Sequence, residues 1–192
     1  MEHPRVVAVS RDGRHRFSKV AVDAVELVAG HGVAGDAHAG ATVQHLSRKR
    51  WTPDLPNLRQ VHLLPVELFD DVRALGLDLA PGELGENVLT AGLDLHALPT
   101  GTRLHLGEAV VRLTGLRNPC VQIDRFRPGL LKAVLFRADD GTPTDEPVRG
   151  NSRQVIRRAG VMSVVEVGGV VAPGQAVEVE LPPGPAEPLQ PV

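Results

Sequence analysis

The chain has one cysteine, Cys120, and no apolar run close to the roughly 20 residues that a membrane-spanning helix needs. A single cysteine cannot form an internal disulfide, which agrees with a reducing compartment. The first residues are too polar, and the apolar stretch after them is too short, for a signal peptide. We therefore expect a cytoplasmic protein with no membrane partner.

Several motifs of well-known chemistry are also missing. The chain has no CxxC pair, no HExxH helix and no His-rich run, so a dedicated zinc site is not expected. It also has no P-loop, no GxGxxG after a strand and no GxSxG. Three histidines, His31, His38 and His45, recur every seven residues. Because the glycines between them make a helix implausible, we interpret this spacing as coincidence.

The net charge of −2 argues against nucleic acid as a partner, but the charges are unevenly placed. Residues 65–108 hold eight acids and two arginines, whereas residues 112–132 hold five basic residues and one acid, Asp124. Since the second stretch contains Cys120, it suits a small anionic ligand near the thiol. The alternative is that these basic side chains form an ordinary solvated face.

Glycine and proline are spread along the chain and divide it into short segments, most of them with the Val- and Leu-rich composition of strands. The expected strands cover residues 5–10, 24–29, 59–64, 86–90, 102–106, 109–114, 161–167 and 176–181. Apolar spacing and turn residues predict a type II turn and three helices. The turn covers residues 172–175 and the helices residues 65–75, 129–138 and 151–158.

The length and the hydrophobic content of 42% predict one domain over residues 1–181. Its many short strands predict a mainly β fold (α+β), in which a barrel or sandwich is covered by a few helices. The remaining segment, 182–192, has five prolines, and we expect it to be a flexible tail.

Cys120 follows a predicted strand at a position where the backbone is stiff. Pro119 fixes its own φ and restricts Asn118, so the loop suits the presentation of a thiol. A cysteine reacts as the thiolate, which nearby positive charge favours, and Arg117 and Arg125 are candidates for that charge. The alternative is that Cys120, like most lone cysteines, is a small buried hydrophobic side chain.

Two further segments place polar side chains among glycines. In residues 30–40, Asp36 and His38 lie two apart and point to the same side of an extended chain, where the carboxylate can orient the imidazole. In residues 82–87, Glu83 or Glu86 could bind a pterin-like ring, and Asn87 could hydrogen-bond it. The alternative for both segments is that the acids cap turns.

These segments occur in the order typical of a known family. The chain resembles the MOSC domain family, named after the C-terminal domain of molybdenum cofactor sulfurases, over residues 20–181. The resemblance rests on Gly35-Asp36-x-His38-x-Gly40, Arg59-Gln60-Val61, Gly82-Glu83-x-Gly85-Glu86-Asn87, Asn118-Pro119-Cys120 and the closing segments Gly160-Val161-Met162, Val167-Gly168-Gly169 and Pro173-Gly174.

The resemblance implies a MOSC-type β-barrel of the stand-alone bacterial type and a role in molybdenum-cofactor chemistry. It implies that Cys120 bears sulfur as a persulfide or contacts the metal. It also implies a pocket lined or shaped by Asp36, His38, Arg59, Glu86 and Asn87. The chain has no room for a pyridoxal-phosphate desulfurase domain and lacks the cysteines of an iron–sulfur cluster, so any sulfur would come from a separate protein.

Our hypothesis from the sequence is a sulfur carrier, similar to a sulfurtransferase, that binds a molybdopterin-type molybdenum cofactor, if only transiently. Cys120 would take sulfur from a cysteine desulfurase and pass it to a molybdoenzyme or a small-molecule acceptor, with His38, oriented by Asp36, as general acid–base. The residues expected to bind the cofactor are Arg59, Glu86, Asn87, Arg117 and Arg125. Two alternatives stay open: a non-catalytic cofactor-binding module with Cys120 as a molybdenum ligand, and an enzyme for another sulfur or N-hydroxylated substrate.

Overall fold

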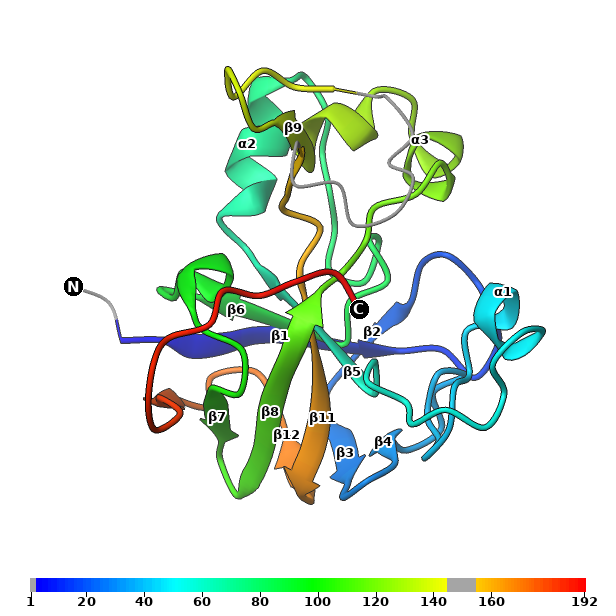
Figure 1. The fold of residues 1–192 in the computed structure, drawn as a ribbon, viewed down its shortest axis with the longest axis vertical. Coiled ribbons are helices and arrows are strands. Elements are labelled where there is room, and N and C mark those ends of the chain that lie inside the picture. The colour runs from blue at the N-terminus through cyan, green and yellow to red at the C-terminus, as the bar shows by residue number, and fades with distance from the viewer. Residues whose placement is uncertain (1–2, 145–154) are drawn as a thin grey trace.

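The computed structural model describes residues 3–144 and 155–192, and its main element is an eight-stranded sheet (Figure 1). All neighbouring strands are antiparallel except β5 and β6, which are parallel. In spatial order the strands are β13 (Val177–Glu180), β7 (Arg103–Leu106), β8 (Ala109–Leu116), β11 (Val161–Val167), β5 (Val61–Pro65), β6 (Val88–Ala91), β1 (Arg5–Arg11) and β2 (Val20–Val22).

Two smaller sheets complete the β structure. The first pairs β3 (Val25–Val28) with β4 (Gly32–Val33) and β12 (Gly169–Val171), and the second pairs β9 (Leu135–Arg137) with β10 (Val155–Arg157). The helical elements are short: α1 (Leu46–Lys49), α2 (Leu68–Ala74), α3 (Gln122–Phe126), and the 3-10 turns η1 (Leu95–Ala97) and η2 (Leu130–Ala133). Among the described residues, no helix has the length and apolar character to cross a bilayer.

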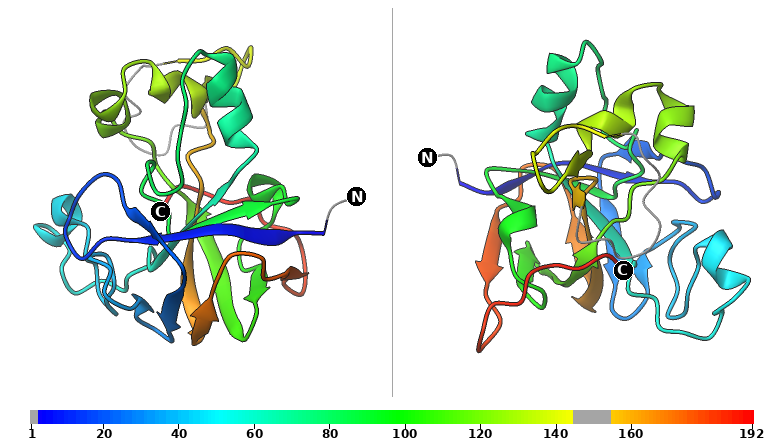
Figure 2. Two further views of the ribbon diagram at one scale, coloured as in Figure 1. Left: turned by 180° about the vertical axis from the view of Figure 1, so that it is seen from behind. Right: turned by 45° about the horizontal axis from the view of Figure 1, so that its top comes forward.

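The two faces of the main sheet pack against different elements and form two apolar cores. Leu63 belongs to the core shared with β3 and β12, whereas Leu64 belongs to the core under α2 and η2. This division follows from the alternation of side chains along a strand. The elements of the second core gather at one end of the molecule, while α1 lies to the side of the sheet (Figures 1 and 2).

The mainly β fold is confirmed, whereas the predicted barrel is not. Among the described residues, the outer strands β13 and β2 form no ladder with each other. One isolated bridge, Arg5 to Ala176, joins the start of β1 to the segment before β13. The amide of Val6 donates to the carbonyl of Gln175, the amide of Gly174 donates to that of Val6, and the amide of Val177 donates to that of Pro4. The main sheet is therefore strongly curved without a complete closing ladder.

All eight predicted strands are present, but parts of two predicted helices are strands in the structure. Within residues 129–138 only η2 is helical, and Leu135–Arg137 forms strand β9. Of residues 151–158, the first four lie outside the described residues, and Val155–Arg157 forms β10 instead of a helix. Because β9 and β10 pair with each other, a long-range contact overrides the local apolar spacing of both segments.

The remaining local predictions are confirmed in part. The helix expected at 65–75 is reduced to α2, because Pro65 is still the last residue of β5. The predicted turn at 172–175 is present: Gly174 has φ +90°, and the amide of Gln175 donates to the carbonyl of Ala172 at 3.4 Å.

Residues 182–192, predicted to be a flexible tail, lie along the sheet. The buried side chain of Leu189 packs in the first core. The amide of Leu116 donates to the carbonyl of Gln190 at 2.8 Å, and the amide of Val192 donates to the carbonyl of Leu116 at 3.2 Å. The flexibility of the segment stays a prediction, but its contacts bring Val192 to the edge of the cavity described next.

Candidate functional site

A cavity of about 620 Å³ opens beside Cys120. It lies where α1 and the loop after it, the turn 82–87 and the segment that follows β8 come together. Five of the eight residues that the sequence singled out line it: His38, Arg59, Asn87, Arg117 and Cys120.

Cys120 is exposed, so the alternative that it is a buried apolar side chain is wrong. The loop that carries it is held on both sides. The side chain of Asn118 accepts a hydrogen bond from Arg157 Nε at 3.1 Å, and the carbonyl of Cys120 accepts one from the amide of Ile123 at 3.0 Å. The thiol is therefore presented to the cavity from a fixed backbone.

Two arginines share the side of the cavity where Cys120 lies, and we call these three residues the thiol wall. Arg117 is held in place because its Nη1 donates to the carbonyl of Leu84 at 2.6 Å. Burial lowers the pKa of the Arg117 guanidinium, and the charge of a thiolate at Cys120 opposes that shift.

Arg59 is the less satisfied of the two arginines. Its Nη2 donates to the main-chain oxygen of Val192, while its buried Nε has no hydrogen-bond partner among the described residues. Burial, together with the charges of Arg48 and Arg117, lowers the pKa of Arg59 to about 10, and a thiolate at Cys120 opposes the shift. The thiol wall thus attracts negative charge and keeps one N–H group unused.

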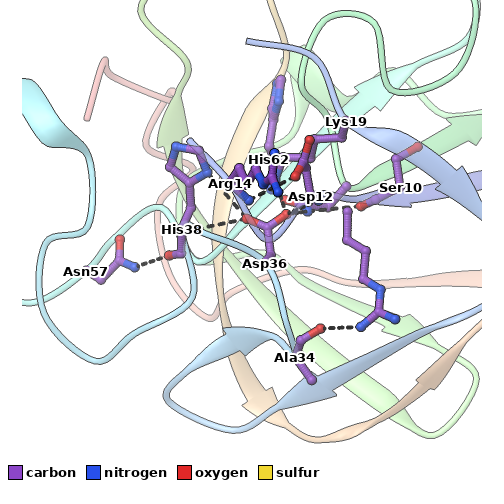
Figure 3. A network of polar contacts seen from close by, with 11 residues as sticks. Ser10, Asp12, Arg14, Lys19, Ala34, Asp36, His38, Asn57 and His62 are labelled. Carbon is purple, nitrogen blue, oxygen red and sulfur yellow. Dashed lines mark hydrogen bonds and ion pairs between the residues drawn. The ribbon is translucent and has the colours of Figure 1, made fainter. Parts of the chain in front are cut away.

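Another part of the cavity lining is held by a buried network around Asp36 (Figure 3). We call Lys19, Asp36, His38 and Asn87 the carboxylate wall. Asp36 Oδ2 accepts from Lys19 Nζ at 2.6 Å and from Asn87 Nδ2 at 3.0 Å. Asp36 Oδ1 accepts from the amide of His38 at 2.9 Å and lies 3.3 Å from His38 Nδ1.

This network fixes the ionisation of Asp36 and the orientation of His38. Burial opposes the ionised form of Asp36, but the hydrogen bonds from His38 and the charge of Lys19 outweigh it and hold the pKa of the carboxyl well below its ordinary value. When the carboxylate accepts a hydrogen bond from His38 Nδ1–H, Nε2 remains as the basic nitrogen of the ring. His38 lines the cavity.

The turn 82–87 connects the two walls. Gly85 has φ +77°, and a Cβ there would lie 2.5 Å from the carbonyl oxygen of Phe17, so only glycine fits. Its Leu84 carbonyl holds Arg117, and its Asn87 amide holds Asp36. Glu86 stabilises the turn from within, because its carboxylate accepts from the amide of Gly82.

Three predicted site residues lie away from the cavity surface. Asp36 is buried beside His38. Glu86 is buried within the turn, where burial raises the pKa of its carboxyl, and its Oε2 has no partner in the part of the chain that the structure describes. Arg125 is exposed on α3 and does not line the cavity. The prediction that Glu86 and Arg125 contact a ligand directly therefore has no support from this geometry.

The sequence analysis missed several cavity residues. Lys19 gave no signal, because nothing in a sequence marks a lysine that will be buried against a distant aspartate. The glycines of segment 31–45 exclude a single helix, so the sequence does not predict that His45 lies near His38. The segment is indeed not one helix, but its loops bring the rings of His38 and His45 to 6.2 Å from each other, and both line the cavity. No group of three His, Cys, Asp or Glu side chains within the described ranges could hold a metal ion.

The structure thus combines a mainly β fold with one exposed cysteine at a cavity that arginine side chains line. The family model of the MOSC domain matches residues 37–178, and the chain belongs to the MOSC domain family. No curated protein matches the chain.

Solved structures share the fold. The YuaD protein from Bacillus subtilis matches with a TM-score of 0.70 and 21% identity, over 93% of this chain and 96% of that one. YiiM from Geobacillus stearothermophilus matches with a TM-score of 0.61 and 16% identity, over 96% and 79% of the two chains. YiiM from Escherichia coli matches with a TM-score of 0.56 and 19% identity, over 95% and 73%.

Proposed function

We propose that this protein is a sulfur carrier, similar to a sulfurtransferase, in which Cys120 holds a persulfide. The observation that carries the proposal is the placement of Cys120: the thiol is exposed and lines a cavity into which Arg59 and Arg117 bring positive charge. Membership of the MOSC family supports a role in molybdenum-cofactor chemistry.

In the loading step, the Cys120 thiolate attacks the terminal sulfur of a cysteine persulfide on a donor. The S–S bond of the donor breaks, the donor cysteine leaves as a thiolate, and a new S–S bond forms on Cys120. No external oxidant or reductant is needed. The product is an anionic persulfide, which the guanidinium groups of Arg59 and Arg117 stabilise.

The carboxylate wall supplies the proton transfer. Asp36 holds His38 in one orientation, with Nε2 free to give or accept a proton at the acceptor of the sulfur. Since Asp36 is itself held by Lys19 and Asn87, the imidazole is oriented before any ligand enters.

The cavity residues fit a molybdopterin-type cofactor. The buried Nε of Arg59, which has no partner among the described residues, and the neighbouring guanidinium groups of Arg48 and Arg117 suit a phosphate group. The Asn87 amide is already engaged, because Nδ2 donates to the Ser10 carbonyl and to Asp36. When bound, such a cofactor supplies a metal centre that can take up sulfur. The proposed partners are a cysteine desulfurase as donor and a molybdoenzyme or small molecule as acceptor, in the cytoplasm.

The decisive experiment is loading with sulfur. The purified protein is incubated with a cysteine desulfurase and cysteine, and its intact mass is measured. We expect a gain of one sulfur atom that dithiothreitol removes, and no gain in Cys120→Ser. Because Cys120 is exposed, this substitution should leave the free energy of unfolding within about 0.5 kcal/mol of wild type. A wild-type protein that gains no labile sulfur, or a Cys120→Ser variant that does, contradicts the proposal.

A second candidate function is storage of the cofactor, with Cys120 as a molybdenum ligand. The cationic thiol wall and its unpaired N–H favour it equally. Expression in a host that makes the cofactor separates the two: molybdenum that co-purifies with wild type but not with Cys120→Ala, without any sulfur adduct, supports storage.

A further inference from the structure

Residues 45–58, which we call the lip, border the cavity and expose an unusual amount of apolar surface. They contain α1 and the loop after it, at the side of the sheet (Figure 1). Trp51, the single tryptophan of the chain, is 76% exposed. Leu46 is 60% exposed and Leu55 is 55% exposed. Large apolar side chains exposed together on one short segment are typical of an interaction surface.

The lip is also cationic. Arg48, Lys49 and Arg50 are consecutive, and Asp54 is the one acid among residues 45–58. The Arg50 guanidinium lies 5.5 Å from the centroid of the Trp51 ring, so charge and apolar surface are interleaved. The whole chain has a net charge of −2, which makes this local excess of positive charge a property of the lip.

The lip continues into the site itself. Arg48, Leu55 and Leu58 line the same cavity as Cys120. On the other side of the thiol, Val121 is 48% exposed and extends the apolar surface next to Cys120. A body that rests on the lip therefore has Cys120 within its footprint. A small sulfur compound needs only the cavity, whereas a protein donor needs a surface of this kind to bring its persulfide to the thiol.

We propose that the lip is the docking surface for the protein that delivers sulfur to Cys120. The partner presents a cysteine persulfide beside an acidic face that carries apolar side chains, because that face complements the lip in charge and polarity. The inference rests on the proposed function and names the partner class for its loading step. The transfer is the one written above: the Cys120 thiolate takes the terminal sulfur, and the donor cysteine leaves as a thiolate.

The test compares two sulfur sources on the same variants. One source is a cysteine desulfurase with cysteine, and the other is glutathione persulfide, which is small enough to enter the cavity without docking. The lip variants are Leu46→Ala/Trp51→Ala and Lys49→Gln/Arg50→Gln, whose side chains do not line the cavity. The controls are Leu181→Ala, with a side chain 62% exposed outside the lip, and Lys132→Gln on η2.

We expect each lip variant to load from the desulfurase about tenfold more slowly at sub-saturating donor, which is the loss typical of an interface residue that contributes on the order of 1.4 kcal/mol. Loading from glutathione persulfide should match wild type, and both controls should match wild type with either source. Raising the salt concentration should slow loading from the desulfurase in wild type more than in Lys49→Gln/Arg50→Gln.

Equal loading of wild type and lip variants from the desulfurase overturns the docking proposal. The same variants also test two other occupants of the lip. If wild type dimerises and the lip variants do not, the occupant is a second copy of this chain. If wild type binds vesicles of phosphatidylserine and phosphatidylcholine and the lip variants do not, the occupant is a membrane. Either result with unchanged loading from the desulfurase overturns the proposal. A wild-type protein that loads from neither source overturns the proposed function and the docking proposal with it.

Discussion

The two walls of the cavity differ in how completely their polar groups are satisfied. In the carboxylate wall, both oxygens of Asp36 accept hydrogen bonds from groups that come from three separate parts of the chain. In the thiol wall, Cys120 is exposed, and the buried Nε of Arg59 has no partner among the described residues. The Asp36 carboxylate is thus already satisfied, whereas the thiol wall is open to further partners.

This difference suits a site that must both orient a proton and accept a ligand. A fully bonded buried network is rigid, because any movement leaves a polar group unpaired in a low-dielectric interior. Unpaired donors beside an exposed nucleophile have the opposite property, since a ligand that satisfies them gains their full hydrogen-bond energy. We therefore expect substitutions in the carboxylate wall to affect folding, and substitutions in the thiol wall to affect ligands.

The largest effect on stability is expected for Asp36→Ala. The Lys19 and Asp36 side chains are only 5% and 2% exposed, so removing the carboxylate leaves a buried ammonium without its partner. The expected loss is about 3–5 kcal/mol in the free energy of unfolding, measured by urea denaturation.

Asp70→Ala is the matched control for this change. It removes a carboxylate at the same 2.6 Å from an arginine, Arg73, but these side chains are 79% and 62% exposed. We expect a loss below about 1 kcal/mol. Equal losses in the free energy of unfolding for the two variants would show that burial does not increase the cost of removing Asp36.

An intermediate effect is expected for Gly85→Ala, with Gly76→Ala as its control. The two glycines have nearly the same φ, +77° and +76°, so both substitutions cost about 1–2 kcal/mol of backbone strain. Gly76 has open space around it, whereas a Cβ at Gly85 meets the Phe17 carbonyl, which adds roughly 1–3 kcal/mol. Urea denaturation of both variants measures the difference. A Gly85→Ala variant as stable as Gly76→Ala would show that the turn can shift without cost.

The smallest effect concerns pH and the partly exposed side chain of His45. Burial, then the charges of Arg59 and His38, lowers the pKa of His45 to about 4. In the unfolded chain the imidazole takes up a proton below about pH 6.5, and in the folded protein it does so only near pH 4. Protonation of His45 therefore does not reduce the stability of the fold above pH 6.5, and it reduces that stability increasingly as the pH falls toward 4.

His45→Gln should accordingly show a smaller loss of stability between pH 7 and pH 4.5 than wild type. Urea denaturation midpoints at both pH values measure this. If wild type and His45→Gln lose the same stability between pH 7 and pH 4.5, protonation of His45 does not cause the loss.

The sequence predicts the strands far better than it predicts the contacts between them. The segments of β8 and β11 have alternating or continuous β-branched and leucine residues that favour strands wherever they are placed. By contrast, β9 and β10 are three residues each and are strands only because they meet. Strand formation that depends on a pairing partner elsewhere in the chain cannot be predicted from the local spacing of apolar residues.

The difference between local pattern and long-range contact also explains which site residues the sequence predicts. Cys120, His38 and Asp36 are recognisable because glycine and proline around them make motifs, and the motifs are ordered as in the MOSC family. Lys19 and Arg48 belong to the cavity through the fold alone. The motif that Glu86 shares with Asn87 predicts that both bind a ligand, yet of the two only Asn87 lines the cavity.

The turn 82–87 has a consequence for any attempt to transplant or redesign this site. Leu84 and Asn87 are three residues apart, and through them one turn sets the position of Arg117 and that of Asp36. The surroundings of Cys120 and the position of His38 are thus not independent of each other. Substitutions near Cys120 that move the turn 82–87 would therefore also move His38. A designed protein that contains one wall needs the turn as well.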